Sequence, residues 1–325
     1  MGNSLGVIDS LSAGYRFLGR RLELLLAPIL LDLLLWLGPR LSIAPLFHQA
    51  AALYNEAANV EGMPPDMAAM STQVAELLNQ SGDSSNLFAM LVNSSLLHVP
   101  SLLTGIAPLS SRAVMEVSNP LAAFLLFVGF SLLGVLIGVI YMNMLARTLP
   151  LGSGPKLVSF GEFAGVVLRH WVMVLVYVAL LVLALLIGSI PVGLATALVS
   201  LISPALGSII VVLLSGVVLV LFFYLYFVTA ALIMDNLPVH RAIVQSFVVV
   251  RTNFWATLGF IVLYYVITIG FALIMANLVQ MTPVGTIIAI LLYAYIGSGL
   301  TMSLLVFYRT RILKHEEQSR FLGTA

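Results

Sequence analysis

Asp32 is a carboxylate inside an otherwise apolar stretch, residues 22–43. It lies eleven residues beyond Arg21, hence about 16 Å into a bilayer if the stretch is helical. A carboxylate at that depth costs about 2.5–3.5 kcal/mol on insertion scales, and such residues often mark ion or proton paths. The alternative role is packing, through a hydrogen bond to a neighbouring helix. Because no second acidic residue lies deep in another apolar stretch, we favour packing, with Asn143 and Asn277 as the candidate partners of an intramembrane polar site.

The remaining side chains give no pattern for catalysis or for a metal. The five histidines are scattered, and no two have ligand spacing on one helix. His315-Glu316-Glu317 begins like a zinc-protease motif, but Ser319 stands where the second histidine belongs. The sequence has no cysteine, no G-x-S-x-G elbow and no phosphate-binding glycine loop. We therefore predict a non-enzymatic protein with no catalytic, metal-binding or cofactor-binding residue. The net charge of +1 gives no basic field for nucleic acid.

The composition indicates which elements must carry these residues. Hydrophobic residues make up 61% of the 325 positions and charged residues 8%, whereas about a quarter is charged in an ordinary soluble domain. Several apolar runs exceed the length of about 18 residues that marks a bilayer-spanning helix. We predict an all-α polytopic integral membrane protein, with about six transmembrane helices in a single membrane domain over residues 1–325.

Six apolar stretches give the positions of the spans. They cover approximately residues 22–43, 120–145, 171–190, 206–234, 255–278 and 283–308. An insertion, residues 44–118, separates the first two spans, and residues 309–325 form a tail. Within the insertion, residues 87–109 are moderately apolar but are interrupted by His98, Pro100 and Pro108. We expect interfacial helices there rather than a span, while a re-entrant segment stays open.

Basic residues orient the spans, because Lys and Arg in short loops mark the cytoplasmic side. Of the fourteen Lys and Arg residues, only Arg40 and Arg112 fall on the side opposite the others. Residues 44–111 contain no Lys or Arg but several acidic residues. We therefore predict cytoplasmic N- and C-termini, an extracytoplasmic insertion 44–118, and a location in a plasma membrane, the inner membrane of a bacterial cell.

A common pattern precedes the first, third and fifth spans. Amphipathic segments at residues 7–21, 158–171 and 239–255 each lead through basic or aromatic residues into an apolar stretch. Such segments are typical of interfacial helices, so we expect three units of an interfacial helix followed by a helical hairpin. The candidate contacts to lipid headgroups are Arg169, Trp171, Arg241, Arg251 and Trp255. Topology alone would also explain the three arginines.

Small and aromatic residues suggest how the spans pack. Gly134 and Gly138 form a G-x-x-x-G motif, which lets helix backbones approach closely. We favour packing within one chain, and a homo-oligomer is the alternative. A further group of tyrosines could line a polar seam but is more typical of a core or an interface belt. These tyrosines are Tyr224, Tyr226, Tyr264, Tyr265, Tyr293 and Tyr295.

Two motifs carry a family resemblance. They are Leu30-Leu31-Asp32 through Gly38-Pro39-Arg40, and Met234-Asp235-Asn236 followed by Ala242, Ser246, Arg251 and Asn253-Phe254-Trp255. In these the chain resembles an uncharacterised group of bacterial multi-span proteins, related to the membrane domain found ahead of some glycerophosphodiester phosphodiesterases. The resemblance covers mainly the third to sixth spans and implies a fold and a membrane location. It implies no activity, because the phosphodiesterase domain is absent here, and no functional residue is carried over.

Two classes of function fit these features. We favour a scaffold, assembly or accessory component whose partners are membrane lipids and a protein or a second copy of the chain. The alternative is a transporter or channel-like protein for a lipid or small solute, with Asp32 in the path. A transporter would be expected to show broken helices in paired repeats and several intramembrane polar sites. A single intramembrane aspartate falls short of that number, so we favour the first class.

Overall fold

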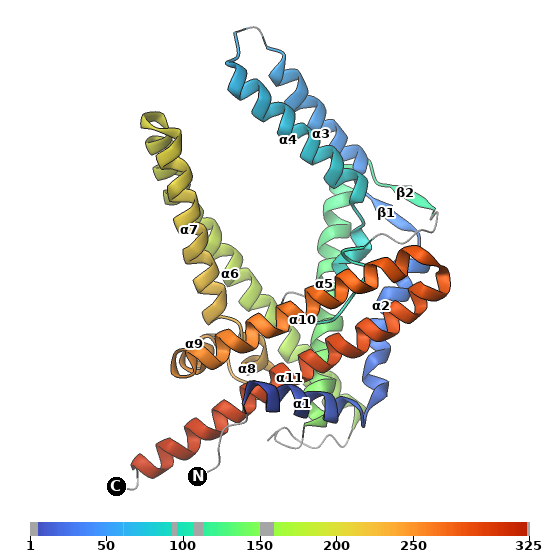
Figure 1. Cartoon of the computed structure of the whole chain (residues 1–325), viewed down its shortest axis with the longest axis vertical. Helices are drawn as coiled ribbons and strands as arrows, with labels where there is room; N and C mark the ends of the chain where they lie inside the picture. Colours follow the sequence, from blue (N-terminus) through green and yellow to red (C-terminus); the bar gives the residue numbers. More distant parts are fainter. Residues whose placement is uncertain (1–5, 61, 93–95, 107–112, 150–158, 324–325) are drawn as a thin grey trace.

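The computed structural model is built almost entirely of helices (Figure 1). It describes residues 6–60, 62–92, 96–106, 113–149 and 159–323, so Arg112 and Lys156 of the charge pattern lie outside the described residues. The α-helices are α1 (Val7–Leu18), α2 (Leu26–Leu37), α3 (Ala44–Ala58), α4 (Pro65–Ser84), α5 (Pro120–Thr148), α6 (Phe160–Ile202), α7 (Pro204–Tyr224), α8 (Val228–Met234), α9 (Val239–Thr252), α10 (Phe254–Met281) and α11 (Pro283–Gly323). Two 3₁₀ turns, η1 (Leu22–Leu25) and η2 (Leu87–Leu91), and two short strands, β1 (Arg40–Ser42) and β2 (Val114–Glu116), complete the fold. The predicted all-α class is confirmed.

Within the described residues, five segments are long and apolar enough to cross a membrane. Four of them are the helices α5, α6, α10 and α11, and the fifth is formed by α7 and α8 together. The α6–α7 hairpin stands away from the other helices (Figure 1) and exposes large apolar side chains such as Ile187, Leu213 and Leu219. Contiguous apolar surface of this extent requires lipid rather than water around it. The chain is therefore a multi-pass membrane protein.

The first predicted span is shorter than expected. Helical structure begins with η1 and ends at Leu37, because Gly38-Pro39 cannot continue the helix and β1 follows. Four 3₁₀ residues and twelve α-helical residues give a length of about 26 Å, close to the roughly 30 Å of a hydrocarbon core. Leu26, Leu30 and Leu34 lie exposed along one side of α2, whereas Asp32 is buried on the other.

Two of the three predicted units contain a separate amphipathic helix before the hairpin. These helices are α1, followed by η1 and α2, and α9, which Asn253 alone separates from α10. The second unit departs from the pattern, since residues 160–171 are the first turns of the continuous helix α6. A separate interfacial helix is therefore not formed there, and residues 150–158 lie outside the described part of the chain.

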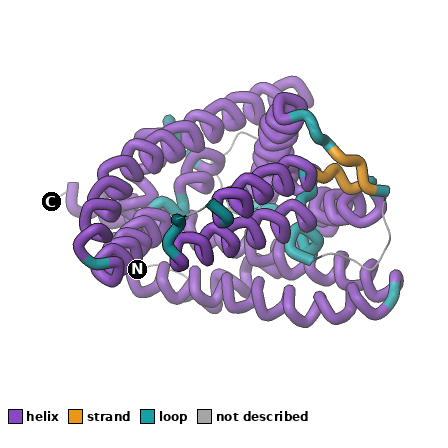
Figure 2. The backbone as a smooth tube through the Cα atoms, turned by 90° about the horizontal axis from the view of Figure 1, so that it is seen from above, coloured by secondary structure: helices purple, strands orange, loops and turns teal. Residues whose placement is uncertain are grey.

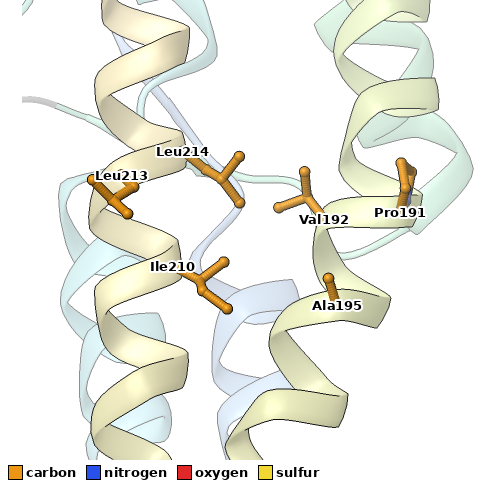
Figure 3. A pocket seen from close by; sticks show the side chains of 6 residues that line it. All are labelled: Pro191, Val192, Ala195, Ile210, Leu213 and Leu214. Atoms are coloured by element: carbon orange, nitrogen blue, oxygen red, sulfur yellow. The ribbon is translucent and has the colours of Figure 1, made fainter.

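The α6–α7 hairpin also turns later than the sequence suggests. Pro191 lies inside α6, and the turn falls at Ser203, directly before Pro204. An apolar gap of about 410 Å³ separates the two helices near Pro191 (Figure 3). Its side chains are Pro191, Val192, Ala195, Ile210, Leu213 and Leu214. Because these side chains carry no polar atom, the gap offers no group for chemistry.

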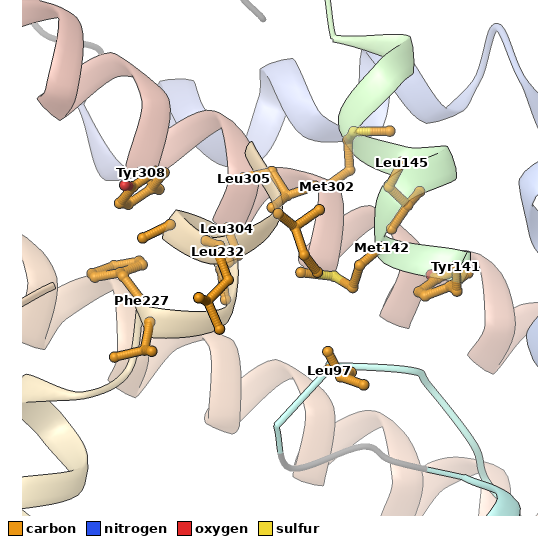
Figure 4. Close-up of a cluster of buried hydrophobic side chains, with 14 of the residues drawn as sticks. Leu97, Tyr141, Met142, Leu145, Phe227, Leu232, Met302, Leu304, Leu305 and Tyr308 are labelled. Atoms are coloured by element: carbon orange, nitrogen blue, oxygen red, sulfur yellow. The ribbon is translucent and has the colours of Figure 1, made fainter. Parts of the chain in front are cut away.

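The main core lies where α5, α8 and α11 meet (Figure 4). Met142 on α5, Leu232 on α8 and Leu304 on α11 are all fully buried there. Gly138 on α5 lies against Leu97, and a Cβ added to Gly138 would come within 2.5 Å of the Leu97 Cδ1 atom. The G-x-x-x-G face therefore packs inside the chain, as favoured from the sequence.

The insertion forms an antiparallel helical hairpin that projects from the body (Figure 1). Its two helices, α3 and α4, approach closely through small residues at Ala44, Ala51, Ala75 and Gly82, all of them buried. At its base, β1 and β2 pair in parallel, with Leu41 opposite Met115. Figure 2 shows this strand pair at one edge of the helical body.

Candidate functional site: the buried Asp32 and the adjacent cavity

A buried polar site forms around Asp32 on α2, whose residue exposure is 1%. Oδ1 accepts hydrogen bonds from the Ser101 hydroxyl and from the Leu103 amide, the latter at 3.2 Å. Oδ2 accepts a hydrogen bond from the Leu102 amide at 3.0 Å. Both carboxylate oxygens are therefore occupied by donors from residues 96–106, about seventy positions away in the chain.

Residues 96–106 are not helical, although the sequence predicts interfacial helices in this part of the insertion. The segment is buried between α2, α5 and α11, and Leu97, Val99 and Leu102 are at most 2% exposed. Only η2 provides a helical turn, because Pro100 lacks the amide donor that a helix requires. The expectation of interfacial helices over residues 87–109 is therefore wrong for the described part.

The depth of this segment explains why it needs Asp32. The Thr301 hydroxyl donates to the His98 carbonyl at 2.7 Å, and Thr301 lies eighteen residues into α11, about 27 Å along the helix axis. Non-helical backbone at membrane depth is tolerated only where protein groups satisfy its amides and carbonyls. Asp32 supplies acceptors for two such amides and Thr301 a donor for one carbonyl. The absence of a side chain at Gly297 lets Pro100 approach α11.

A cavity of about 440 Å³ lies on the other side of this segment, against α10 and α11. Polar side chains in its wall come from residues 98–106, from α10 and from α11. Ala272, Ala276 and Gly297 leave the space that larger residues would fill. The polar members are His98, Ser101, Thr104, Tyr264, Tyr265, Thr268 and Tyr293. Asp32 does not line the cavity, because Ser101 and Leu102 lie between them.

His98 is a buried group in the cavity wall, with 5% exposure. The ring hydrogen-bonds to the backbone of Leu96 and makes edge contacts with Tyr226 and Tyr264. Its Nδ1 atom has no hydrogen-bond partner among the described residues. The sequence itself shows only that the histidines are scattered, and no local pattern distinguishes His98.

The two predicted amide partners do not meet Asp32. Asn143 is buried on α5, and its Oδ1 lies 2.9 Å from Nδ1 of His170. Asn277 is exposed on α10, where its amide donates to the Leu273 carbonyl of the same helix at 3.3 Å. The polar site predicted from Asp32, Asn143 and Asn277 is therefore not assembled within the described residues.

Two polar contacts that the sequence did not reveal tie α8 to neighbouring helices. Asp235 accepts from the Tyr308 hydroxyl at 2.5 Å and pairs with the Arg309 guanidinium at 2.7 Å. Asn236, which has a positive φ of 52°, places its Oδ1 3.2 Å from Nε2 of His170. Met234-Asp235-Asn236 is one of the motifs behind the family resemblance, and here it joins α8 to α6 and α11. In the sequence, only the charge of Asp235 next to an apolar stretch indicates that these contacts exist.

The candidate headgroup contacts lie mostly at the surface. Arg169, Arg241 and Arg251 are exposed, and Trp255 is 80% exposed. Trp171 is half-buried, and its indole N–H donates to the Leu132 carbonyl of α5 at 3.1 Å. Four of the five side chains are thus free to reach lipid headgroups, whereas Trp171 joins two helices.

Within the described residues, no group of three or more His, Asp or Glu side chains is arranged to hold a metal ion. Comparisons with protein-family models, with curated proteins and with solved structures each gave no match. The resemblance to the bacterial multi-span proteins therefore stays a prediction.

Proposed function

We propose that this protein is a non-enzymatic assembly or accessory component of a bacterial plasma membrane, and that its α3–α4 hairpin binds a protein partner on the extracytoplasmic side. The observation that carries this proposal is the hairpin itself. It projects from the helical body, it is held firmly at its base, and it exposes apolar side chains along one stripe.

Hydrogen bonds hold the base of the hairpin in one orientation. The Arg40 guanidinium donates to the backbone carbonyls of Ser85 (2.9 Å) and Asp83. The Asn86 side chain accepts from the Leu41 amide at 3.3 Å and caps η2. These contacts involve β1, the end of α4 and the start of η2, so the hairpin cannot swing freely about a flexible linker. A fixed projection loses little orientational entropy when it binds.

The exposed stripe on α4 gives the chemistry of the partner. Met67, Met70 and Leu77 recur at helical spacing and are 58%, 67% and 56% exposed. Flexible methionine side chains are typical of adaptable binding surfaces. Asp66 lies exposed beside the stripe, so the complementary surface is an apolar groove with a basic residue at its rim.

The positions of the ends support the orientation. In Figure 1, α1 and the C-terminal part of α11 lie at the end of the molecule opposite the tip of the α3–α4 hairpin. In the sequence, most of the basic residues near the spans fall on the same side as the two termini. Residues 44–111, which include the hairpin, lack Lys and Arg. By the positive-inside rule, the hairpin then belongs outside and the termini inside.

Photo-crosslinking in native membranes tests the proposal. A photoreactive amino acid at Met70 or Leu77 should capture one protein in roughly equal stoichiometry, and the same residue at Thr72 should capture much less. Thr72 is an exposed control because it lies on another side of α4. The double variant Met70→Ser/Leu77→Ser should lose the partner while the protein stays in the membrane. Equal capture at all three positions, or capture of none, would contradict the proposal.

The cavity favours the alternative function, a transporter or channel-like protein for a lipid or small solute. That alternative requires Asp32 to take part in movement, yet its oxygens are engaged by residues 101–103. Flux through reconstituted vesicles separates the two functions. Transport of a lipid, ion or proton by the wild-type chain that is lost in a folded Asp32→Asn variant would replace our proposal.

A further inference from the structure

The cavity beside residues 98–106 is set into the lipid-facing side of α10. Tyr265, Ile269 and Leu273 line its mouth and are 49%, 56% and 66% exposed. They lie in a segment that is apolar and long enough to cross a membrane. A molecule can therefore enter from the bilayer without passing through water.

The wall of the cavity combines two kinds of surface. Ile269, Ala272, Leu273 and Ala276 of α10 form an apolar strip along its length. Tyr265 and Tyr293 also line it, and neither tyrosine hydroxyl makes a hydrogen bond to another described residue. Hydroxyl groups in an apolar setting favour a ligand with oxygen atoms of its own.

Charge narrows the ligand class further. Among the residues that the structure describes, no Lys, Arg, Asp or Glu lines the cavity, and the carboxylate of Asp32 is already fully engaged. A phosphate or carboxylate headgroup would therefore lose its hydration and gain no counter-charge. A pure hydrocarbon, in turn, would leave the tyrosine hydroxyls unpaired.

We propose that this cavity binds an uncharged amphiphile whose head carries hydroxyl or ester oxygens, a lipid of the diacylglycerol type. Its oxygen atoms accept hydrogen bonds from Tyr265 and Tyr293, and its acyl chain lies along the apolar strip of α10. His98 in the same wall adds a polar imidazole ring, whose Nδ1 atom has no hydrogen-bond partner among the described residues. The site is separate from the α3–α4 hairpin and does not depend on the assembly function.

Equilibrium binding of tritiated dioleoylglycerol to the purified full chain in detergent tests this inference. Ala272→Phe fills the cavity and should abolish saturable binding, whereas Val262→Phe, on the exposed surface of the same helix, should leave it unchanged. Tyr293→Phe removes one hydroxyl and should weaken binding about fivefold to tenfold. Ile269→Trp fills the cavity from its mouth and is the second cavity-filling variant. It replaces Ala272→Phe if size-exclusion chromatography shows that Ala272→Phe is misfolded.

Two further probes decide the ligand class. Dioleoyl phosphatidate, which is charged, and squalene, which has no oxygen, should each compete with dioleoylglycerol at least about tenfold less well. Equal competition by phosphatidate or squalene would overturn the proposed class. Binding of dioleoylglycerol that is absent, or that is unchanged in both cavity-filling variants, would overturn the site.

Discussion

Replacing Asp32 tests whether its carboxylate is a structural acceptor for the buried segment of residues 96–106. Asp32→Leu has a similar volume but removes both oxygens, so the Leu102 and Leu103 amides lose their acceptor. Asp32→Asn keeps one oxygen and turns the other position into a donor. That donor would face an amide N–H, since each carboxylate oxygen accepts from one backbone amide.

The expected magnitudes follow from the number of amides left unsatisfied. A buried donor without a partner costs about 1–3 kcal/mol, so Asp32→Asn should cost on the order of 1–3 kcal/mol. Asp32→Leu strands two amides and should cost on the order of 2–6 kcal/mol. From the sequence alone we would expect Asn to change stability little. The structure revises that expectation, because both oxygens are in use.

Thermal unfolding in detergent, followed by size exclusion, measures this order of stability. We expect wild type to be most stable, Asp32→Asn to be intermediate and Asp32→Leu to be least stable. Asn277→Leu is the matched control, because Asn277 is exposed and bonds only within its own helix. The reasoning fails if Asp32→Leu unfolds at the wild-type temperature, or if the control variant is destabilised as much as Asp32→Leu.

Two other substitutions test contacts of α11. Gly299→Leu should loosen α1, because any Cβ there overlaps a tyrosine ring of α1. The substitution should lower the free energy of unfolding by about 1–3 kcal/mol and speed proteolysis of the N-terminal segment. The control Gly270→Leu should do neither, because a Cβ at Gly270 meets nothing within 4 Å. Equal proteolysis of the two variants would refute this contact. Arg309→Ala removes the guanidinium that pairs with the largely buried Asp235 at 2.7 Å and should cost on the order of 3 kcal/mol in thermal unfolding. The exposed control Arg251→Ala should cost far less, and a small effect of Arg309→Ala would show that the ion pair is unimportant.

The membrane helices could be predicted because hydropathy is a local property. The predicted span at residues 120–145 corresponds to α5 (Pro120–Thr148), and that at 255–278 corresponds to α10 (Phe254–Met281). The amphipathic helix α9 could also be recognised, since its apolar and basic residues alternate at helical spacing. The first span was predicted too long, because residues 38–43 are apolar but lie beyond the end of α2 and include β1.

The candidate site could be predicted only in part. Asp32 is conspicuous in the sequence, but its donors come from Ser101–Leu103, and no periodicity links positions so far apart. Continuity of α6 through Pro191 was also missed, because neighbouring groups in a membrane helix can compensate for the missing amide. The cavity depends on three elements that meet only in the folded chain.

Cysteine accessibility in intact cells tests the central claim, that an outer hairpin and a buried segment follow the first span. Single cysteines at Gln73 in α4, Leu102 beside Asp32 and residue 319 near the C-terminus should give three different results with a membrane-impermeant maleimide. Position 73 should label from outside, position 319 only after lysis, and position 102 in neither case while the protein stays folded. Labelling of position 102 from outside as fast as position 73, or identical behaviour of positions 73 and 319, would contradict the claim.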